Sequence, residues 1–280
     1  MFIYRSRFLI RGEVWFDDEP DGSRVDWIYH HQRTSPLANH RWKTFYTVLV
    51  DLRKTRAEIF AAMEEKTARK ITEAKEKDKL WCEGCDLRDG AIINEAQAMW
   101  DEFAAAQNTP RLDRAWLDKF REAGVLDVVA ARDSAGDLLV YHLVLLTPKR
   151  ARQLIAISAY KPVPSIAWRN EVSRANCLIH WHNFQRFKEQ GIPFFDFGGW
   201  YRGSTDIQLL GINAFKKSFG GKVVEEFDCE QPVTVKGWVA LAVAQLLTRF
   251  RRSSRPIGAD SEKEHHAPQA QEHTISPAFR

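Results

Sequence analysis

Short apolar runs and helical periodicity alternate along the chain. Runs rich in β-branched and aromatic residues predict three early strands, at 2–10, 25–31 and 45–51. Apolar residues then recur near one side of a helical turn over 55–77, and Thr55 with Glu58 three residues later forms a capping-box pattern. The first part of the chain therefore predicts strands followed by one long helix.

The middle of the chain predicts a particular order of elements. The expected strands lie at 80–85, 125–132, 138–146, 152–158, 194–197 and 223–227. The expected helices lie at 92–106, 112–122, 170–190 and 212–219. Residues 79–228 thus follow the order β-α-α-β-β-β-α-β-α-β, in which three consecutive strands form an antiparallel meander. We expect an α/β (α+β) protein with a mixed sheet flanked by helices.

The C-terminal part is apolar and basic before it becomes polar. The stretch from Lys236 to Arg255 holds five basic residues and no acid. It can pack against the domain, or lie on a membrane with its arginines toward anionic headgroups, and both roles stay open. The apolar side chains concerned are Trp238, Val239, Leu246, Leu247 and Phe250, and the arginines are Arg249, Arg251 and Arg252. The polar, irregular segment 253–280 predicts a disordered tail.

Composition narrows the class of protein without choosing a function. The 280 residues are 44% hydrophobic and 28% charged, which excludes a wholly disordered or collagen-like chain. A net charge of +4 permits contact with phosphates or anionic lipid but does not indicate a DNA-binding protein. Four cysteines are too few for a disulfide scaffold, and neither a signal peptide nor a membrane span is predicted. We therefore expect a cytoplasmic protein.

The most distinctive motif joins a buried strand to a short helix. FFDFGGWYRG (194–203) ends a strand with Asp196 and two glycines, and GINAFKKSFGG (211–221) places Lys216 beside an apolar helix face. A carboxylate, paired glycines and a lysine at one strand end suit the handling of an anionic or polarised group. The structural alternative is a tight turn, a packed helix and solvated lysines.

This motif resembles the C-terminal signature of the Fem-type (FemAB-like) aminoacyltransferases, which belong to the GNAT-like acyltransferase superfamily. The helix at 64–79 is also similar, with Arg69, Ile71 and Ala74 at matching spacing. The resemblance covers about two thirds of the chain. It implies a complete GNAT-like acyltransferase domain at 79–232, a shortened N-terminal GNAT-like region at 1–78 and a basic amphipathic helix at 233–252. Typical Fem enzymes also carry a full first domain and a coiled-coil arm, neither of which we find here.

The glycine content of the loop before one predicted helix bears on the identity of the acyl donor. CoA-using GNAT proteins bind the pyrophosphate with a glycine-rich loop before a helix, whereas residues 158–176 contain no glycine. The missing glycines therefore disfavour acyl-CoA. The resemblance to Fem-type enzymes, which also lack this loop and use aminoacyl-tRNA, implies aminoacyl-tRNA as the donor, and no bound cofactor is expected. Arg169 and Arg174, near the start of the following helix, are candidates to meet donor phosphates, with solvated arginines as the alternative.

The resemblance also implies roles for individual residues. Lys216 matches the lysine of the family's F-K pair and is expected to stabilise the oxyanion of acyl transfer. Asp196 is the second catalytic candidate, orienting the acceptor or accepting a proton, or else capping the turn. Further substrate-binding candidates are Asn176, His180, Trp200, Tyr201 and Lys217. His180 has a packed core position as its alternative, and no metal site is expected.

Together these observations predict acyl or aminoacyl transfer to an amine or hydroxyl of a cell-envelope precursor, either a peptidoglycan or a polysaccharide intermediate. A CoA-dependent GNAT N-acyltransferase is one alternative, and a catalytically silent GNAT-like binding subunit is another. The expected partners are the acyl donor with its tRNA and the precursor. A membrane surface is a further partner if residues 235–255 lie on a membrane rather than pack against the domain.

Overall fold

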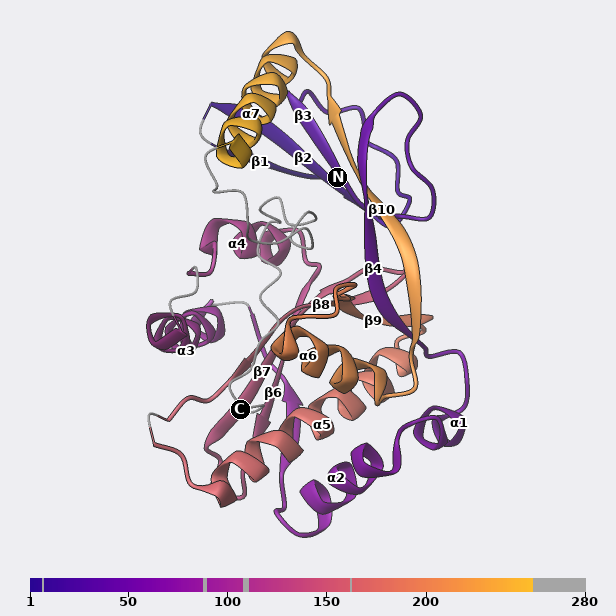
Figure 1. Ribbon diagram of the computed structural model, residues 1–280. Coiled ribbons are helices and arrows are strands. Elements are labelled where there is room, and N and C mark those ends of the chain that lie inside the picture. The colour runs from indigo at the N-terminus through magenta and orange to yellow at the C-terminus, as the bar shows by residue number, and fades with distance from the viewer. Residues whose placement is uncertain (7, 88–89, 108–110, 162, 254–280) are drawn as a thin grey trace. The chain divides into compact units, whose positions relative to one another are not determined.

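The computed structural model describes residues 1–6, 8–87, 90–107, 111–161 and 163–253 (Figure 1). Of these, 1–45 and 225–253 form one compact unit, and 46–224 form the other. The predicted disordered tail lies, from residue 254 onward, outside the described residues.

The first unit is a small sheet with one helix. Its strands are β1 (Phe2–Ser6), β2 (Leu9–Trp15), β3 (Trp27–Arg33) and most of β10 (Lys222–Pro232). β1 pairs antiparallel with β2, and β10 pairs antiparallel with β3. β2 and β3 are parallel to each other. The helix α7 (Val235–Ser253) follows β10, and a small core forms around Val14, Val25 and Ile28.

The second unit contains the larger sheet. Its strand order is β4 (Arg41–Asp51, which begins in the first unit), β9 (Phe194–Gly199), β8 (Ala151–Ser158), β7 (Leu138–Leu146), β6 (Leu126–Arg132) and β5 (Trp81–Gly84). Strands β6 to β8 form the predicted antiparallel meander, β5 adds to it antiparallel to β6, and β8 runs parallel to β9. This confirms the predicted mixed sheet and the predicted order of elements from residue 79 onward.

Helices cover both faces of this sheet (Figure 1). Neighbouring residues of a strand point to opposite faces, and Tyr141 donates to Glu95 on α3 while His142 lies against Asn183 on α5. Every residue of β8 is buried, as expected for a strand covered on both sides. The helices are α1 (Arg56–Ala61), α2 (Glu65–Glu76), α3 (Ala91–Gln107), α4 (Arg114–Glu122), α5 (Ile166–Glu189) and α6 (Ile207–Lys217).

Three helix boundaries differ from the predicted ones because of particular hydrogen bonds. The helix predicted at 55–77 is broken between α1 and α2, where Glu64 N donates to the Ser218 carbonyl at 2.8 Å. The predicted capping box of Thr55 and Glu58 is present. Helices α5 and α6 begin four and five residues earlier than predicted, because Ser165 and Asp206 cap their first turns.

The division of the chain also differs from the predicted boundary at residue 78. Val50 of β4 pairs with Phe195 of β9, and α2, whose Ile71 and Ala74 are buried, packs against α5. Residues 46–78 therefore complete the larger unit, although they precede the predicted start of the acyltransferase domain.

Candidate functional site

The two parallel strands of the larger unit separate soon after they meet. Both strands are described in full, and β8 pairs with β9 only at Ala151 with Phe195 and at Arg152 with Asp196. Beyond this point β8 continues to Ser158 and β9 to Gly199 without pairing with each other, while β8 stays paired with β7 and β9 with β4. The backbone edges from Gln153 and Phe197 onward are therefore separated, which opens the sheet beside the predicted motif.

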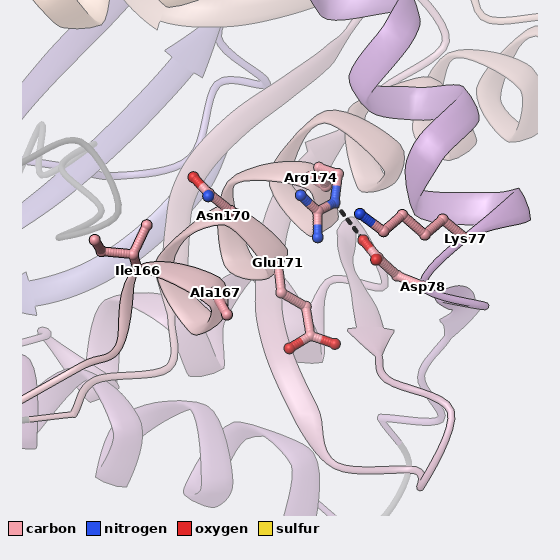
Figure 2. A pocket seen from close by; sticks show the side chains of 7 residues that line it. All are labelled: Lys77, Asp78, Ile166, Ala167, Asn170, Glu171 and Arg174. Carbon is pink, nitrogen blue, oxygen red and sulfur yellow. Dashed lines mark hydrogen bonds and ion pairs between the residues drawn. The ribbon is translucent and has the colours of Figure 1, made fainter.

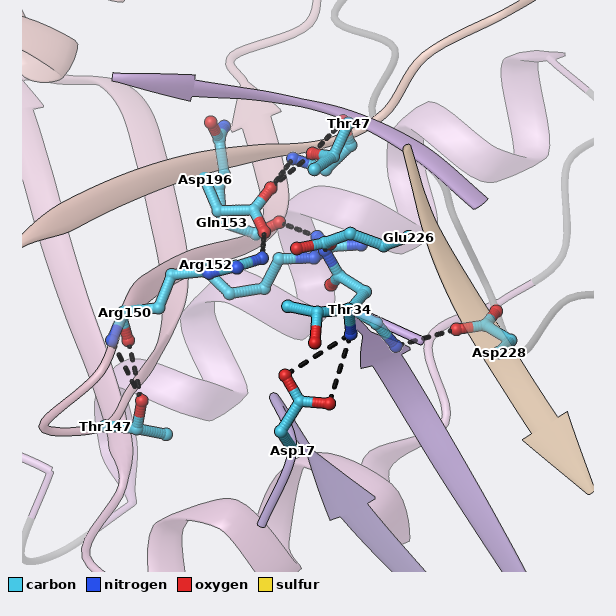
Figure 3. A network of polar contacts seen from close by, with 12 residues as sticks. Asp17, Thr34, Thr47, Thr147, Arg150, Arg152, Gln153, Asp196, Glu226 and Asp228 are labelled. Atoms are coloured by element: carbon cyan, nitrogen blue, oxygen red, sulfur yellow. Dashed lines mark hydrogen bonds and ion pairs between the residues drawn. The ribbon is translucent and has the colours of Figure 1, made fainter. Parts of the chain in front are cut away.

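Asp196 lies at the point where the strands separate (Figure 3). Its carboxylate is fully buried and accepts hydrogen bonds from the Arg150 guanidinium at 3.0 Å and from Gly198 N at 2.8 Å. The Thr47 hydroxyl of β4 donates to the same carboxylate. Three neighbouring segments are thus joined through one charged side chain.

The ionised form of Asp196 is favoured despite its burial. Burial alone would raise the pKa of Asp196, but the positive charges of Arg150 and Arg152 and the two hydrogen bonds from Thr47 and Gly198 hold it below its ordinary value. In this structure the Asp196 carboxylate therefore makes contacts that stabilise the fold. Its catalytic role toward an acceptor stays a prediction.

Gly198 is required by the turn that follows Asp196. Its φ is +74°, and a Cβ at this position would lie 2.6 Å from Nη1 of Arg152. The first glycine of the D-F-G-G motif therefore lets the Arg152 guanidinium approach the backbone at the end of β9.

Lys216 projects from α6 to the end of β9. Its side chain is 2% exposed, and Nζ donates to the Gly199 carbonyl at 2.5 Å. The helix is fixed to the preceding loop because the Asn213 side-chain amide bonds both backbone groups of Tyr201, at 3.1 and 2.7 Å. A buried ammonium group is thus held beside the separated strands.

His180 occupies the core position that was its structural alternative. Its ring is 1% exposed, Nδ1 donates to the Asn176 carbonyl, and Nε2 lies 3.0 Å from the Gln153 side-chain amide. Asn176 is buried as well and donates to the Ser158 hydroxyl at 2.9 Å. These polar side chains of α5 and β8 thus contact one another at the part of β8 that pairs with β7 but no longer with β9.

Burial keeps His180 neutral. It lowers the pKa of His180 to about 3, the Asn176 carbonyl acts in the opposite direction, and the nearby Lys216 ammonium lowers the pKa further. His142, whose ring centroid lies 4.3 Å from that of His180, also has its pKa lowered well below the usual value, by burial and then by His180. Two neutral imidazoles are therefore enclosed in the larger unit.

Because these two buried histidines stay neutral, we expect the protein to lose stability in mild acid. Below pH ~6.5 the unfolded chain binds protons that buried His142 and His180 do not, so the free energy of unfolding falls by up to about 1.4 kcal/mol per pH unit for each. The loss attributable to His180 accumulates down to its folded pKa of about 3. Urea unfolding from pH 7 to about pH 5 should show this slope, and His180→Gln should reduce it. A slope that His180→Gln leaves unchanged would contradict the assignment.

An open pocket of about 520 Å³ lies at the start of α5 (Figure 2). It is lined by Lys77, Asp78, Ile166, Ala167, Asn170, Glu171 and Arg174. Arg174, a predicted phosphate contact, is paired with Asp78, and both side chains are largely buried. Burial raises the pKa of Glu171, with Asp78 and Asp133 acting in the same direction. The pocket therefore contains both signs of charge, and its arginine already has a carboxylate partner.

The remaining predicted residues lie on both sides of the motif. Trp200 is half-buried against the main core, and its backbone N donates to the Tyr46 backbone carbonyl at 2.7 Å. The Tyr201 hydroxyl lies 3.4 Å from that of Thr205, and Lys217 donates to the Gly221 carbonyl at 2.9 Å. Arg169 is half-buried in the second turn of α5. The structure thus groups Trp200, Tyr201 and Lys216 at one strand end, and Arg169 and Arg174 at the start of α5.

Sequence reasoning missed four residues that shape the site. Thr47, Arg150 and Arg152 surround Asp196, and Gln153 faces His180. The only available signal was the polar sequence R-A-R-Q at the start of an otherwise apolar strand. No group of three or more histidine, cysteine or acidic side chains suited to a metal occurs among the described residues.

In the larger unit, a long helix, α5, connects the two parallel strands of a mixed sheet, and the order of elements is the one expected of the predicted GNAT-like domain. Comparison with solved structures agrees: the chain resembles FemX with a TM-score of 0.55 at 14% sequence identity. That match covers 72% of this chain and 63% of the FemX chain, so this protein corresponds to less than two thirds of FemX. The chain therefore has a fold similar to that of FemX.

Two further structures match less well. A C-terminal domain (DUF2156) assigned to a lysylphosphatidylglycerol synthetase of Agrobacterium fabrum has a TM-score of 0.49 at 18% identity, covering 79% of this chain and 72% of that one. L-PGS from Bacillus licheniformis has a TM-score of 0.47 at 13% identity, covering 78% and 72%. No protein-family model and no curated protein sequence matches the chain.

Proposed function

We propose that the larger unit transfers an acyl or aminoacyl group to an amine or hydroxyl of a cell-envelope precursor, a peptidoglycan or polysaccharide intermediate. The observation that carries this proposal is the buried Lys216 ammonium at the end of β9, beside strands that separate after Arg152 and Asp196. The Fem-like fold supports it by analogy.

The proposed chemistry uses the charge of Lys216. The acceptor nitrogen or oxygen forms a bond to the acyl carbon, and negative charge develops on the acyl oxygen. We assign to Lys216 Nζ, which donates to the Gly199 carbonyl in this structure, the donation of a hydrogen bond to that oxygen. The bond from the acyl carbon to the donor's oxygen or sulfur then breaks, and the proton lost by the acceptor passes to that leaving atom. We assign no side chain as general base, so the substrate itself carries this proton.

Aminoacyl-tRNA is the proposed donor, with tRNA as the corresponding partner. The pocket at the start of α5 places Asp78 and Glu171 where a CoA pyrophosphate would need positive charge, and Arg174 is paired with Asp78. The Ser165 hydroxyl already accepts from Trp168 N at 3.1 Å, which removes one N–H of the first turn from phosphate binding. These features disfavour CoA, although a CoA-dependent N-acyltransferase is the alternative within the same fold.

A calorimetric titration with acetyl-CoA tests the donor. We expect no heat of binding at concentrations up to about 1 mM, which corresponds to a binding free energy weaker than about −4 kcal/mol. Asp78→Asn is the matched variant, because it frees Arg174 and removes one carboxylate from the pocket. Micromolar binding by the unmodified protein would contradict the proposed donor and favour the CoA-dependent alternative.

A further inference from the structure

Helix α7 packs on the rest of the first unit through the side that carries Gly237 and Leu241. A Cβ at Gly237 would lie 2.0 Å from the Asp26 carbonyl oxygen, so only glycine allows this approach. Leu241, one turn later on the same side, is 5% exposed. On the inward side of the described part of α7, a glycine thus approaches the Asp26 backbone closely and a leucine is buried.

Asp26 fixes the start of this helix. Its carboxylate accepts from the Thr234 hydroxyl at 2.8 Å and from Lys236 Nζ at 3.1 Å, and its carbonyl accepts from Val233 N at 2.9 Å. These hydrogen bonds, with the peptide N–H of Thr234 also close, set the direction in which α7 leaves β10. The orientation of its outward side is therefore determined.

The outward side of α7 carries large apolar side chains. Their positions follow one another at helical spacing, so they form a single stripe along the helix. The stripe consists of Val235, Trp238, Val239, Val243 and Leu246, which are 81%, 56%, 58%, 49% and 52% exposed. A helix that only covers its own domain turns its larger apolar residues inward, and α7 does the opposite.

A second group of exposed apolar residues is tied to the start of α7. Ile10 N donates to the Asp26 carboxylate at 2.9 Å, and Asp26 N donates to the Ile10 carbonyl at 2.7 Å. Ile10 is 41% exposed, and Phe8, in the preceding turn, is 58% exposed. Asp26 therefore connects the beginning of β2 to the start of α7.

The charge of α7 indicates what covers the stripe. Residues 235–253 contain no acidic residue and four basic ones, of which Lys236 is paired with Asp26 and the other three are Arg249, Arg251 and Arg252. Apolar side chains with basic flanks and no acid are typical of helices that lie at the surface of anionic bilayers. No helix in the described part of the chain is long and apolar enough to cross a membrane.

We propose that the stripe of α7, together with Phe8 and Ile10, binds the surface of an anionic lipid bilayer. The apolar side chains enter the boundary between headgroups and acyl chains, and the C-terminal arginines contact the lipid phosphates. This proposal goes beyond acyl transfer and does not depend on it, because it concerns only residues of the first unit.

Vesicle flotation of the full chain tests the proposal. Binding to phosphatidylcholine vesicles containing about 30% phosphatidylglycerol should be clear, weaker on phosphatidylcholine alone, and reduced at about 0.5 M salt. The double variant Val239→Glu/Leu246→Glu should bind at least about tenfold more weakly, because it places two charges in the stripe.

The matched control is Val163→Glu/Ile207→Glu, which changes two apolar residues of the other unit that are 92% and 84% exposed. It should float like the unmodified protein. Equal flotation of the stripe variant and the unmodified protein would overturn the proposal. So would an unmodified chain that ignores vesicles and sediments as a dimer which the stripe variant dissociates, since the stripe would then contact a second copy.

Discussion

Replacing Lys216 with Met is expected to lower the rate of acyl transfer by about 10²–10³-fold. Methionine keeps most of the side-chain volume but removes the ammonium group that lies at the end of β9. Because the charge acts on an oxygen that becomes negative only during reaction, kcat should fall while KM changes little. Single-turnover transfer from a labelled donor measures this effect.

A matched lysine separates this effect from a general loss of positive charge. Lys222, six residues later and exposed at the start of β10, is replaced in the control Lys222→Met. It should retain full transfer. Equal activity of Lys216→Met and the unmodified protein, with both folded by circular dichroism, would remove Lys216 from the mechanism.

Replacing Asp196 with Ala is expected to lower the free energy of unfolding by about 3–5 kcal/mol. The substitution leaves Arg150 beside a buried position with no carboxylate, takes a counter-charge from Arg152, and removes the acceptor of Gly198 N. Urea unfolding at pH 7 measures the loss. Asp196 stabilises the fold above pH ~4, and this contribution disappears as the pH falls through its lowered folded-state pKa.

Asp51 provides the comparison for Asp196. It belongs to β4 of the same unit and pairs with Arg53 at 2.8 Å, but the Arg53 side chain is 64% exposed. Asp51→Ala should therefore cost less than about 1 kcal/mol. If Asp196→Ala cost no more than Asp51→Ala, the buried network would not hold the separated strands in place.

Much of the fold could be predicted from the sequence because its signals are local. The strands of the meander are continuous apolar runs, and the order of elements from residue 79 onward follows from them. The break between α1 and α2 could not be predicted, because it depends on the bond from Glu64 to Ser218, more than 150 residues away. Local helix propensity continues through this break, and only tertiary contact interrupts it.

The site shows the same division between local and distant signals. The motif around Asp196 and Lys216 was visible, and the structure places both residues at the end of β9 or beside it. The partners of Asp196 and Arg174 were not visible, since Arg150 and Asp78 lie 46 and 96 residues away from them. The sequence alone does not show whether a charged side chain is paired within the fold or is accessible to a substrate.

The measurement that tests the central claim most directly is transfer itself. A cell-envelope precursor fraction is incubated with the protein and labelled aminoacyl-tRNA, or with acyl-CoA, and analysed by mass spectrometry. The account predicts that the precursor gains one aminoacyl group with the unmodified protein and tRNA donor, and that the gain is lost with Lys216→Met. Retained binding of the precursor with no transfer from either donor would contradict it and identify a catalytically silent binding subunit.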